Sequence, residues 1–267
     1  MAKHKICLDA GHYGKYYNQS PANKKYYESV VMWELHLKLK KHLESYGFEV
    51  ITTRSNRDKD LALTERGKMS KGCDLFLSLH SNAVGDKIND KIDYPVSYVP
   101  INGKGDKIGK LLADCIQKVM GTEQAGRIES RRGSNGDYYG VIRGATSVDT
   151  IGIIVEHSFH TNTAMTNWLM QGANLDKLAK AEADVIAAHF GIETNESILY
   201  RVQVGAYTER ANATTMLAKV KAAGFDAFIT ISDGYYKVQV GAFSKKANAD
   251  GQLQVLKKAG FEAFITK

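Results

Sequence analysis

The segment KICLDAGH, residues 5–12, places a short apolar run directly in front of Asp-Ala-Gly-His. A continuous apolar run of this length is typical of a strand that is buried on both faces, so residues 5–10 are predicted to form one. Residues 26–46 then repeat apolar side chains at helical spacing, and Gly47 is a suitable residue to end that helix. The chain therefore opens with a strand followed by a long helix.

The same alternation continues through the first two thirds of the chain. Further strands are expected over residues 48–52, 74–79, 96–99, 139–143 and 151–155, and helices over residues 61–71, 108–120 and 175–190. Alternating strands and helices indicate an α/β fold in which helices cover both faces of a mostly parallel sheet. We therefore predict a three-layer α/β domain over residues 1–192, with binding residues beyond the carboxyl ends of its strands.

The last third of the chain contains an internal repeat. When the sequence is shifted by 36 positions, residues 200–231 align with residues 236–267 without a gap, and 18 of the 32 aligned positions are identical. Each copy begins with an alternating strand pattern, continues at helical spacing and ends in a second strand. Because one such unit cannot bury its own apolar face, we predict a small α+β domain of two βαβ repeats over residues 199–267. A linker is expected over residues 193–198.

Charge and cysteine content narrow the possible functions. The chain carries a net charge of +7, and residues 199–267 contain ten basic but only five acidic side chains, so most of the excess belongs to the repeat. Such an excess favours an anionic partner, for example nucleic acid, a membrane surface or an acidic polymer. The three cysteines are widely spaced, which fits a chain that folds in a reducing compartment. No stretch approaches the ~20 apolar residues that span a bilayer.

Polar side chains stand where three of the expected strands end. His12, His80 and Glu156 each follow one of these strands, while Glu28 lies at the start of the first helix. Two imidazoles and one carboxylate form a ligand set that leaves a zinc ion one open position, as in zinc peptidases. A further carboxylate is then needed as general base and proton shuttle, and Glu156 is the candidate.

Spacing alone leaves other assignments open. A histidine after a strand is more often structural than metal-binding, and Glu34 competes with Glu28 as the acidic ligand. His36, His157 and His160 are further imidazoles of a type that binds metals. The candidates share no helix, unlike the His-Glu-x-x-His motif, so no local signal decides among them.

Four segments that occur in this order resemble one enzyme family. They are LDAGHYG (8–14), the long helix headed by Glu28, DLFLSLHSNA (74–83) and IIVEHSFHTN (153–162). Together they are similar to the zinc-dependent N-acetylmuramoyl-L-alanine amidases, which remove stem peptides from peptidoglycan, and the similarity covers the whole first domain. The resemblance implies that His12, Glu28 and His80 bind Zn²⁺ and that Glu156 is the catalytic glutamate.

The sequence departs from the family pattern close to these residues. Tyr13 stands where the family has a glycine, Ser29 follows the acidic ligand where Lys is frequent, and His157 stands where a small or apolar residue is usual. These departures affect the shape of the pocket floor. They leave His157 and His160 as candidate substrate contacts, and Asn82, in the Leu-His-Ser-Asn-Ala motif, is a third.

The repeat resembles the SPOR peptidoglycan-binding domain, with RVQVGAY in its first half and KVQVGAF in its second. By that resemblance it is a four-stranded antiparallel sheet flanked by helices, and it binds glycan strands that lack stem peptides. Gln203 and Gln239 interrupt the apolar strands on the face opposite the valines, so they are candidate glycan contacts. Tyr207 and Phe243 are aromatic candidates, and the alternative is that both rings belong to the core.

The combined prediction is an enzyme that hydrolyses the amide between N-acetylmuramic acid and L-alanine with Zn²⁺ and Glu156, and that binds glycan through its repeat. Peptidoglycan is the expected partner, nucleic acid is not expected, and the sequence does not specify an oligomeric state. The alternatives are a zinc peptidase that cuts within the stem peptide and a non-catalytic protein that binds the wall or nucleic acid. Because no apolar signal segment is present, we expect cytoplasmic synthesis and action on the wall after release, as for a phage endolysin or a mother-cell lysis enzyme.

Overall fold

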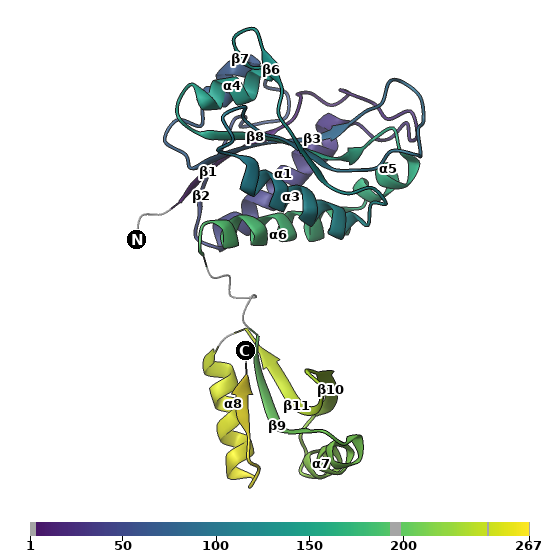
Figure 1. Ribbon diagram of the computed structural model, residues 1–267, viewed down its shortest axis with the longest axis vertical. Coiled ribbons are helices and arrows are strands. Elements are labelled where there is room, and N and C mark those ends of the chain that lie inside the picture. The colour runs from purple at the N-terminus through teal and green to yellow at the C-terminus, as the bar shows by residue number, and fades with distance from the viewer. Residues whose placement is uncertain (1–3, 193–198, 245, 267) are drawn as a thin grey trace. The chain divides into compact units, whose positions relative to one another are not determined.

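The chain divides into two compact units, residues 1–192 and residues 193–267 (Figure 1). The computed structural model describes residues 4–192, 199–244 and 246–266. Each unit has its own hydrophobic core. The linker expected over residues 193–198 lies outside the described residues.

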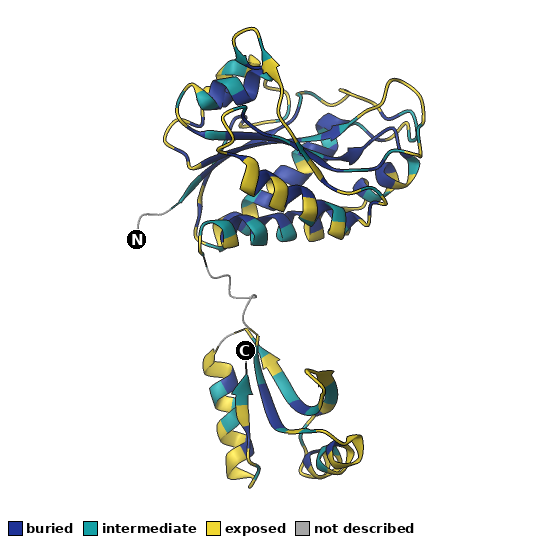
Figure 2. Cartoon of the chain, in the orientation of Figure 1, coloured by how far each residue is buried: buried dark blue, intermediate teal, exposed yellow. Residues whose placement is uncertain are grey.

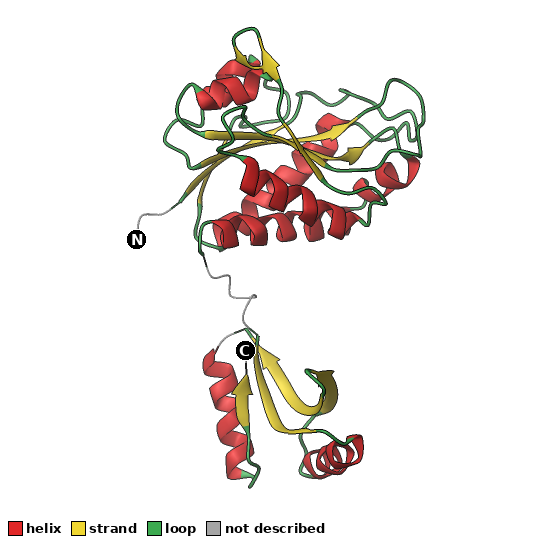
Figure 3. Cartoon of the chain, in the orientation of Figure 1, coloured by secondary structure: helices red, strands yellow, loops and turns green. Residues whose placement is uncertain are grey.

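The first unit is built on a six-stranded sheet with the order β2-β1-β3-β8-β4-β5 (Figure 3). The strands are β1 (Lys5–Ala10), β2 (Glu49–Thr52), β3 (Leu75–Asn82), β4 (Val96–Tyr98), β5 (Arg127–Glu129) and β8 (Ile151–Phe159). The first four strands in that order are parallel to one another, β4 is antiparallel to β8, and β5 is parallel to β4. The expectation of a mostly parallel sheet is confirmed.

Helices cover both faces of this sheet, as the alternation of elements predicts. Three long helices, α1 (Glu28–Ser45), α3 (Asp106–Met120) and α6 (Gly172–His189), pack into the main core on one face. The short helices α2 (Leu63–Lys68) and α4 (Gly140–Thr146) cover the other face, where α4 contributes to a second cluster. The remaining elements are α5 (Thr163–Leu169) and a small hairpin of β6 (Arg132–Gly133) and β7 (Gly136–Asp137).

Strand β1 shows why this layered arrangement follows from the sequence. Ile6 and Leu8 pack into the core beneath α1, whereas Cys7 packs into the cluster beside α4. Successive side chains of a strand point to opposite faces, so a continuous apolar run needs helices on both sides. Figure 2 shows the central strands buried between the two helical layers.

The structure corrects two details of the expected elements. β3 continues to Asn82 and β8 to Phe159, so His80 and Glu156 lie within strands and do not follow them. The expectation of a strand over residues 139–143 is wrong, because helix α4 begins there at Gly140. Periodicity cannot separate a strand from a helix in so short an apolar run. Here Gly144 allows close packing against α2, since a Cβ at this position would lie 2.2 Å from the backbone oxygen of Thr64.

The second unit is a four-stranded antiparallel sheet with the order β10-β11-β9-β12. Its elements are β9 (Tyr200–Tyr207), α7 (Arg210–Ala222), β10 (Phe228–Ser232), β11 (Tyr235–Phe243), α8 (Lys246–Lys258) and β12 (Phe264–Thr266). Each repeat therefore contributes a strand, a helix and a second strand, as predicted. The long strands β9 and β11 are neighbours at the centre, so each repeat completes the sheet of the other. Within the described residues of the chain, no helix combines the length and apolar character needed to cross a membrane.

A buried ion pair fixes the end of β1 in the first unit. The Asp9 carboxylate accepts hydrogen bonds from Nε of Arg66 at 2.8 Å, from Oγ of Ser78 at 2.6 Å and from Oγ1 of Thr53 at 2.5 Å. Burial opposes ionisation of this carboxyl, but the charge and hydrogen bonds of Arg66 outweigh it and lower the pKa of Asp9. The pair thus ties α2 and β3 to β1 immediately before the chain reaches His12.

The substitution Arg66→Met should lower the free energy of unfolding of the first unit by about 3–5 kcal/mol, because it leaves a buried carboxylate without its charged partner. Urea unfolding followed by tryptophan fluorescence reports on this unit alone, since both tryptophans lie in it. The matched control is Lys110→Met, which removes an exposed ion pair with Asp114 and should cost less than about 1 kcal/mol. Equal losses in the two variants would contradict the importance of the buried pair.

Candidate functional site

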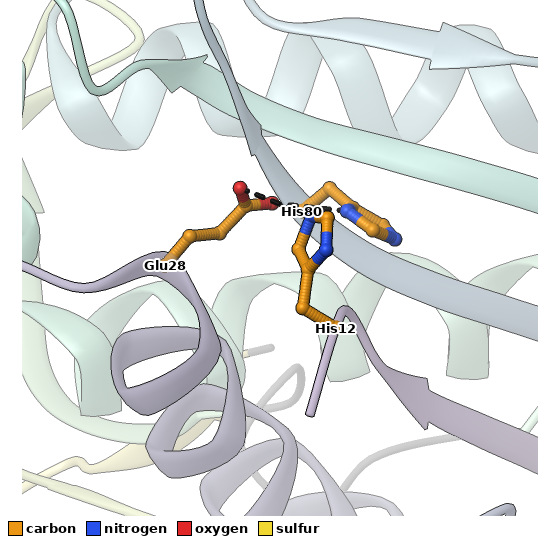
Figure 4. Close-up of side chains that lie close together, drawn as sticks. All are labelled: His12, Glu28 and His80. Atoms are coloured by element: carbon orange, nitrogen blue, oxygen red, sulfur yellow. Dashed lines mark hydrogen bonds and ion pairs between the residues drawn. The ribbon is translucent and has the colours of Figure 1, made fainter. Parts of the chain in front are cut away.

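The three expected metal ligands lie together at the carboxyl ends of β1 and β3 (Figure 4). His12 comes two residues after β1, His80 is on β3, and Glu28 is the first residue of α1. One potential ligand atom from each side chain lies within 4.8 Å of the other two. Residues 68 positions apart in the sequence thus form one compact group.

The parallel pairing of β1 with β3 brings the two histidines together. Ala10, the last residue of β1, pairs with Leu79, which directly precedes His80 on β3. The two imidazole rings meet nearly edge to face with centroids 4.9 Å apart. Gly11 lies between them, and a Cβ there would be 2.5 Å from Cε1 of His80. The glycine of Asp-Ala-Gly-His is therefore required for the close approach of the His80 ring.

Glu28 lies between the two histidines and is buried. Its Oε2 is 3.2 Å from Nε2 of His12, and its Oε1 is 2.9 Å from Nδ1 of His80. The carboxylate also accepts hydrogen bonds from the backbone N–H of Ser81 at 3.0 Å and from the amide of Asn18 at 2.8 Å. Burial disfavours the ionised form, but the hydrogen bonds and charges of the histidines hold the pKa of Glu28 well below its usual value. The site therefore contains a carboxylate anion.

The surroundings of His80 favour the neutral imidazole that binds metals. Burial lowers the pKa of His80. The Oγ of Ser78 donates to Asp9 at 2.6 Å and lies 3.1 Å from Nε2 of His80, so it is placed to accept a proton from that nitrogen. The Nδ1 of His80 lies 2.9 Å from Oε1 of Glu28. Because a carboxylate only accepts, a proton or a bound cation must lie between these two atoms. The Nδ1 of His80 and the Glu28 carboxylate can both bind a cation placed between them. The hydrogen bond to Ser78 orients the His80 ring for this role.

Of the alternative ligands from the sequence, His160 lies beside the group, with its Nδ1 4.0 Å from Oε2 of Glu28, whereas Glu34 and His36 do not approach it. Glu34 is exposed on α1 and does not join the group of three. His36 is buried, and its Nδ1 is 2.6 Å from the backbone oxygen of Trp33. The residue that sequence reasoning missed is Asn18, whose amide lies 3.0 Å from Nε2 of His12. Asn18 stands in an irregular segment, so no periodicity marked it.

Glu156 lies beside the group of three on the neighbouring strand. In the register of β3 and β8, Glu156 pairs directly with His80. Its carboxyl group is buried, and Oε2 has no hydrogen-bond partner among the described residues. Burial, followed by the negative charge of Glu28, raises the pKa of Glu156 well above its usual value. A buried carboxyl group with a raised pKa is suited to take up and release a proton.

The three candidate substrate contacts in the first unit mainly contact protein. His157 has no exposed surface, and its nitrogens lie 2.9 Å from the backbone oxygen of His80 and 2.8 Å from Oε1 of Glu182. Since both partners are acceptors, both nitrogens donate; burial opposes the resulting charge, but Glu182 outweighs it and raises the pKa of His157. The ring therefore holds the backbone of β3 at His80 through a hydrogen bond. Because both of its nitrogens are engaged, neither is available to a substrate.

His160 and Asn82 are also engaged with their neighbours. The Nδ1 of His160 is 2.8 Å from the backbone oxygen of Ser81, and the ring stacks on Tyr26 with centroids 5.7 Å apart. The side-chain oxygen of Asn82 accepts the backbone N–H of Ala83 at 2.8 Å. Roles in substrate binding stay predictions for these residues, while their contacts stabilise the end of β3.

The glutamine pair of the second unit lies at the centre of its sheet. Gln203 and Gln239 pair across β9 and β11, and each has an aromatic neighbour on an outer strand. Phe228 on β10 pairs with Gln239, and Phe264 on β12 pairs with Gln203. The two phenylalanines are about half exposed, whereas the two glutamines are buried. The row Phe228–Gln239–Gln203–Phe264 therefore crosses all four strands and presents its rings to solvent.

The other two aromatic candidates are attached to the core. Tyr207 and Phe243 are partly buried and pack against the apolar cluster of the second unit. Each ring lies over the glycine two residues earlier, because a Cβ would be 2.5 Å from the Tyr207 hydroxyl at Gly205 and 2.8 Å from the Phe243 ring at Gly241. This packing agrees with the alternative that both rings belong to the core. The outer phenylalanines were missed, although their alternation with core-facing Ile residues in Ala-Phe-Ile-Thr was a usable signal.

Comparison with known families gives two matches that together span most of the chain. Residues 6–188 match the family of N-acetylmuramoyl-L-alanine amidases, and residues 196–267 match the SPOR domain family. Among curated proteins, the chain is 30% identical over 231 residues to the N-acetylmuramoyl-L-alanine amidase CwlM of Bacillus licheniformis. It is 29% identical over 234 residues to the sporulation-specific N-acetylmuramoyl-L-alanine amidase of Bacillus subtilis. Both alignments cover 86% of this chain and 85% of the relative.

Solved structures share the fold of the first unit. N-acetylmuramoyl-L-alanine amidase AmiC2 of Nostoc punctiforme aligns with a TM-score of 0.61 at 19% identity, over 71% of this chain and 98% of that one. The catalytic domain of CwlV from Paenibacillus polymyxa aligns with a TM-score of 0.60 at 21% identity, over 71% and 99%. At these identities the comparison establishes the α/β architecture.

The substitution Glu28→Gln should reduce binding of Zn²⁺ by the purified chain at least about tenfold, because it replaces an anionic ligand of the buried group by a neutral amide. Metal content after dialysis, measured by mass spectrometry, gives the result. The matched control is Glu34→Gln on the exposed side of the same helix, which should bind zinc like the unsubstituted chain. If Glu34→Gln lost zinc and Glu28→Gln kept it, Glu34 and not Glu28 would be the acidic ligand.

Proposed function

This chain belongs to the family of N-acetylmuramoyl-L-alanine amidases, and we propose that it cleaves peptidoglycan at a zinc centre held by His12, Glu28 and His80, with Glu156 as general base and acid. Its class as a peptidoglycan amidase with a SPOR domain follows from the family matches. The register of β3 and β8 pairs Glu156 with His80, and this pairing supports the proposed role of Glu156 next to the zinc ligands. One proton carrier and three potential ligands therefore share one edge of the sheet.

The donor set fits zinc. Two imidazole nitrogens and one carboxylate oxygen are a frequent catalytic ligand set for this ion, and the fourth position stays open for reacting groups. The lowered pKa values of Glu28 and His80 both favour the protonation states that metal binding requires. A zinc ion held there polarises a carbonyl group and makes a nearby water molecule more acidic.

Glu156 is suited to move the protons of amide hydrolysis. Its Oε2 has no partner among the described residues, so it is available to a water molecule or to a leaving amine. Its raised pKa makes Glu156 a stronger proton acceptor than an exposed glutamate, as a general base requires. In the proposed reaction it accepts a proton from the attacking water and then donates it to the nitrogen of the departing L-alanine. The C–N bond breaks, and the muramic acid lactyl group keeps the new carboxylate.

The SPOR domain supplies a second attachment to the same polymer. Linking a binding domain to a catalytic domain raises the local concentration of substrate without any new contact at the catalytic site. The row Phe228–Gln239–Gln203–Phe264 offers two exposed rings and a polar centre, which suits a chain of sugars. We propose this row as its glycan-binding surface.

The substitution Glu156→Gln should leave the fold and the bound zinc in place but lower the turnover of peptidoglycan at least about a hundredfold, because it removes the proton carrier. Mass analysis of digested peptidoglycan measures the reaction. The unsubstituted chain should release peptides with a free amino group on L-alanine and leave intact sugars.

Two outcomes would count against this assignment. Appreciable hydrolysis by Glu156→Gln, with zinc content equal to that of the unsubstituted chain, would remove Glu156 from the reaction. New amino groups on residues within the stem peptide, with L-alanine still attached to muramic acid, would show a zinc peptidase.

Replacing Phe228 and Phe264 by alanine should weaken binding to glycan strands without stem peptides by about tenfold, because two exposed rings are lost from the row. Co-sedimentation with purified glycan, in a Glu156→Gln background, gives the affinity. The control is Ile231→Ala, which removes another exposed apolar side chain from β10. Equal weakening by the control would mean that no specific surface is formed by the row.

A further inference from the structure

The segment between β1 and α1 exposes aromatic rings next to the metal ligands. Tyr13 is 38% exposed, Tyr16 69% and Tyr17 46%, and Tyr27, just before α1, is partly exposed. Large exposed apolar groups that gather in one place mark binding surfaces more often than isolated ones do. These four side chains, here called the tyrosine platform, take no part in the chemistry proposed for the centre.

The tyrosine platform begins at a metal ligand. The Tyr17 ring stacks on the ring of His12, with centroids 5.0 Å apart and planes 17° from parallel. Tyr13 contacts Tyr17 at 5.5 Å, and Tyr16 meets Tyr27 edge to face at 5.1 Å. One aromatic pair therefore lies against a metal ligand, and a second pair is formed by tyrosines of the same segment.

The backbone beneath the platform is anchored, so the exposure of the rings does not come from an unattached segment. The N–H of Gly14 donates to the backbone oxygen of Arg57 at 2.8 Å, and the N–H of Tyr17 donates to Oγ of Ser29 at 3.2 Å. The hydroxyl of Tyr27 accepts a hydrogen bond from the side chain of Gln19 at 2.8 Å. A binding surface held in this way loses little conformational freedom when a ligand arrives.

A fifth tyrosine in the same segment shows the contrast. Tyr26 is fully buried, and its hydroxyl lies 2.7 Å from Oγ of Ser81. Tyr26 thus serves the core, whereas the four platform tyrosines leave ring faces in solvent. Core packing explains why residue 26 is a tyrosine, but it does not explain the exposed rings of the four platform tyrosines.

We propose that the tyrosine platform binds the sugar rings of the glycan strand on the muramic acid side of the scissile amide. The inference rests on the proposed function. The lactyl group joins the scissile carbonyl to a pyranose ring through only a few bonds. When the carbonyl is at the catalytic centre, that ring must therefore lie close to His12. The C–H faces of pyranose rings pack on aromatic faces, and tyrosine hydroxyls reach the sugar hydroxyls. The platform carries four aromatic rings and no acidic side chain among them, and the ammonium of Lys15 lies 5.4 Å from the Tyr16 ring. This composition suits uncharged sugars better than the carboxylate-bearing stem peptide.

Two soluble substrates with the same stem peptide test the platform, one with a single muramic acid and one with a tetrasaccharide. The unsubstituted full chain should have a lower KM for the tetrasaccharide. In Tyr13→Ala/Tyr16→Ala this advantage should shrink by about three- to tenfold, with kcat unchanged. The matched Tyr13→Phe/Tyr16→Phe variant keeps the rings and should retain most of the advantage. Tyr17 is left in place because its ring contacts His12.

The outcomes separate this proposal from the proposed function. An equal rise in KM for both substrates would assign the tyrosines to the stem peptide or to the fold, and no change in either KM would exclude the platform. If the unsubstituted chain turned over neither substrate, the proposed function would fail. Equilibrium binding of the tetrasaccharide would then still test the platform, by comparing Glu156→Gln with Glu156→Gln that also carries Tyr13→Ala/Tyr16→Ala. Weaker binding by the second variant supports the platform as a sugar-binding surface, and equal binding overturns it.

Discussion

The buried carboxylate of Glu28, placed between His12 and His80, is the interaction on which the organisation of the first unit depends. A buried anion is costly unless other groups pair with it and bond to it. Here two imidazoles, an amide and a backbone N–H surround it, and they come from β3 and from the segment between β1 and α1. The fold therefore brings distant parts of the chain to a charge that needs all of them.

The layers around this charge keep its partners in place. The pair of Asp9 and Arg66 fixes the end of β1, and the ring of His157, held by Glu182 on α6, supports the backbone at His80. Both are buried ion pairs, one at the end of β1 before His12 and one against the backbone of His80. Burial also raises the pKa of Glu156, so the surroundings of the proposed ligands also suit the neighbouring carboxyl to the proton transfer proposed for it.

The fold class could be predicted because its signals are local, whereas the roles expected for His12, Glu28, His80 and Glu156 came from the resemblance to the amidase family. An apolar run that ends in a polar residue marks a strand end, and parallel strands end at one edge. The supporting contacts could not be predicted. Asn18 stands in an irregular segment, Glu182 faces inward from a helix where a glutamate is usually exposed, and α4 shares its apolar pattern with a strand. Each depends on three-dimensional neighbours that periodicity does not encode.

The central claim is that one metal ion binds at the meeting point of β1, β3 and α1. Anomalous diffraction at the zinc absorption edge, from crystals of the zinc-loaded full chain, tests it most directly. The account predicts one strong peak about 2.0–2.2 Å from a nitrogen of His12, a nitrogen of His80 and a carboxylate oxygen of Glu28. A peak bound by other residues, or no peak at this site in a zinc-loaded and active chain, would contradict it.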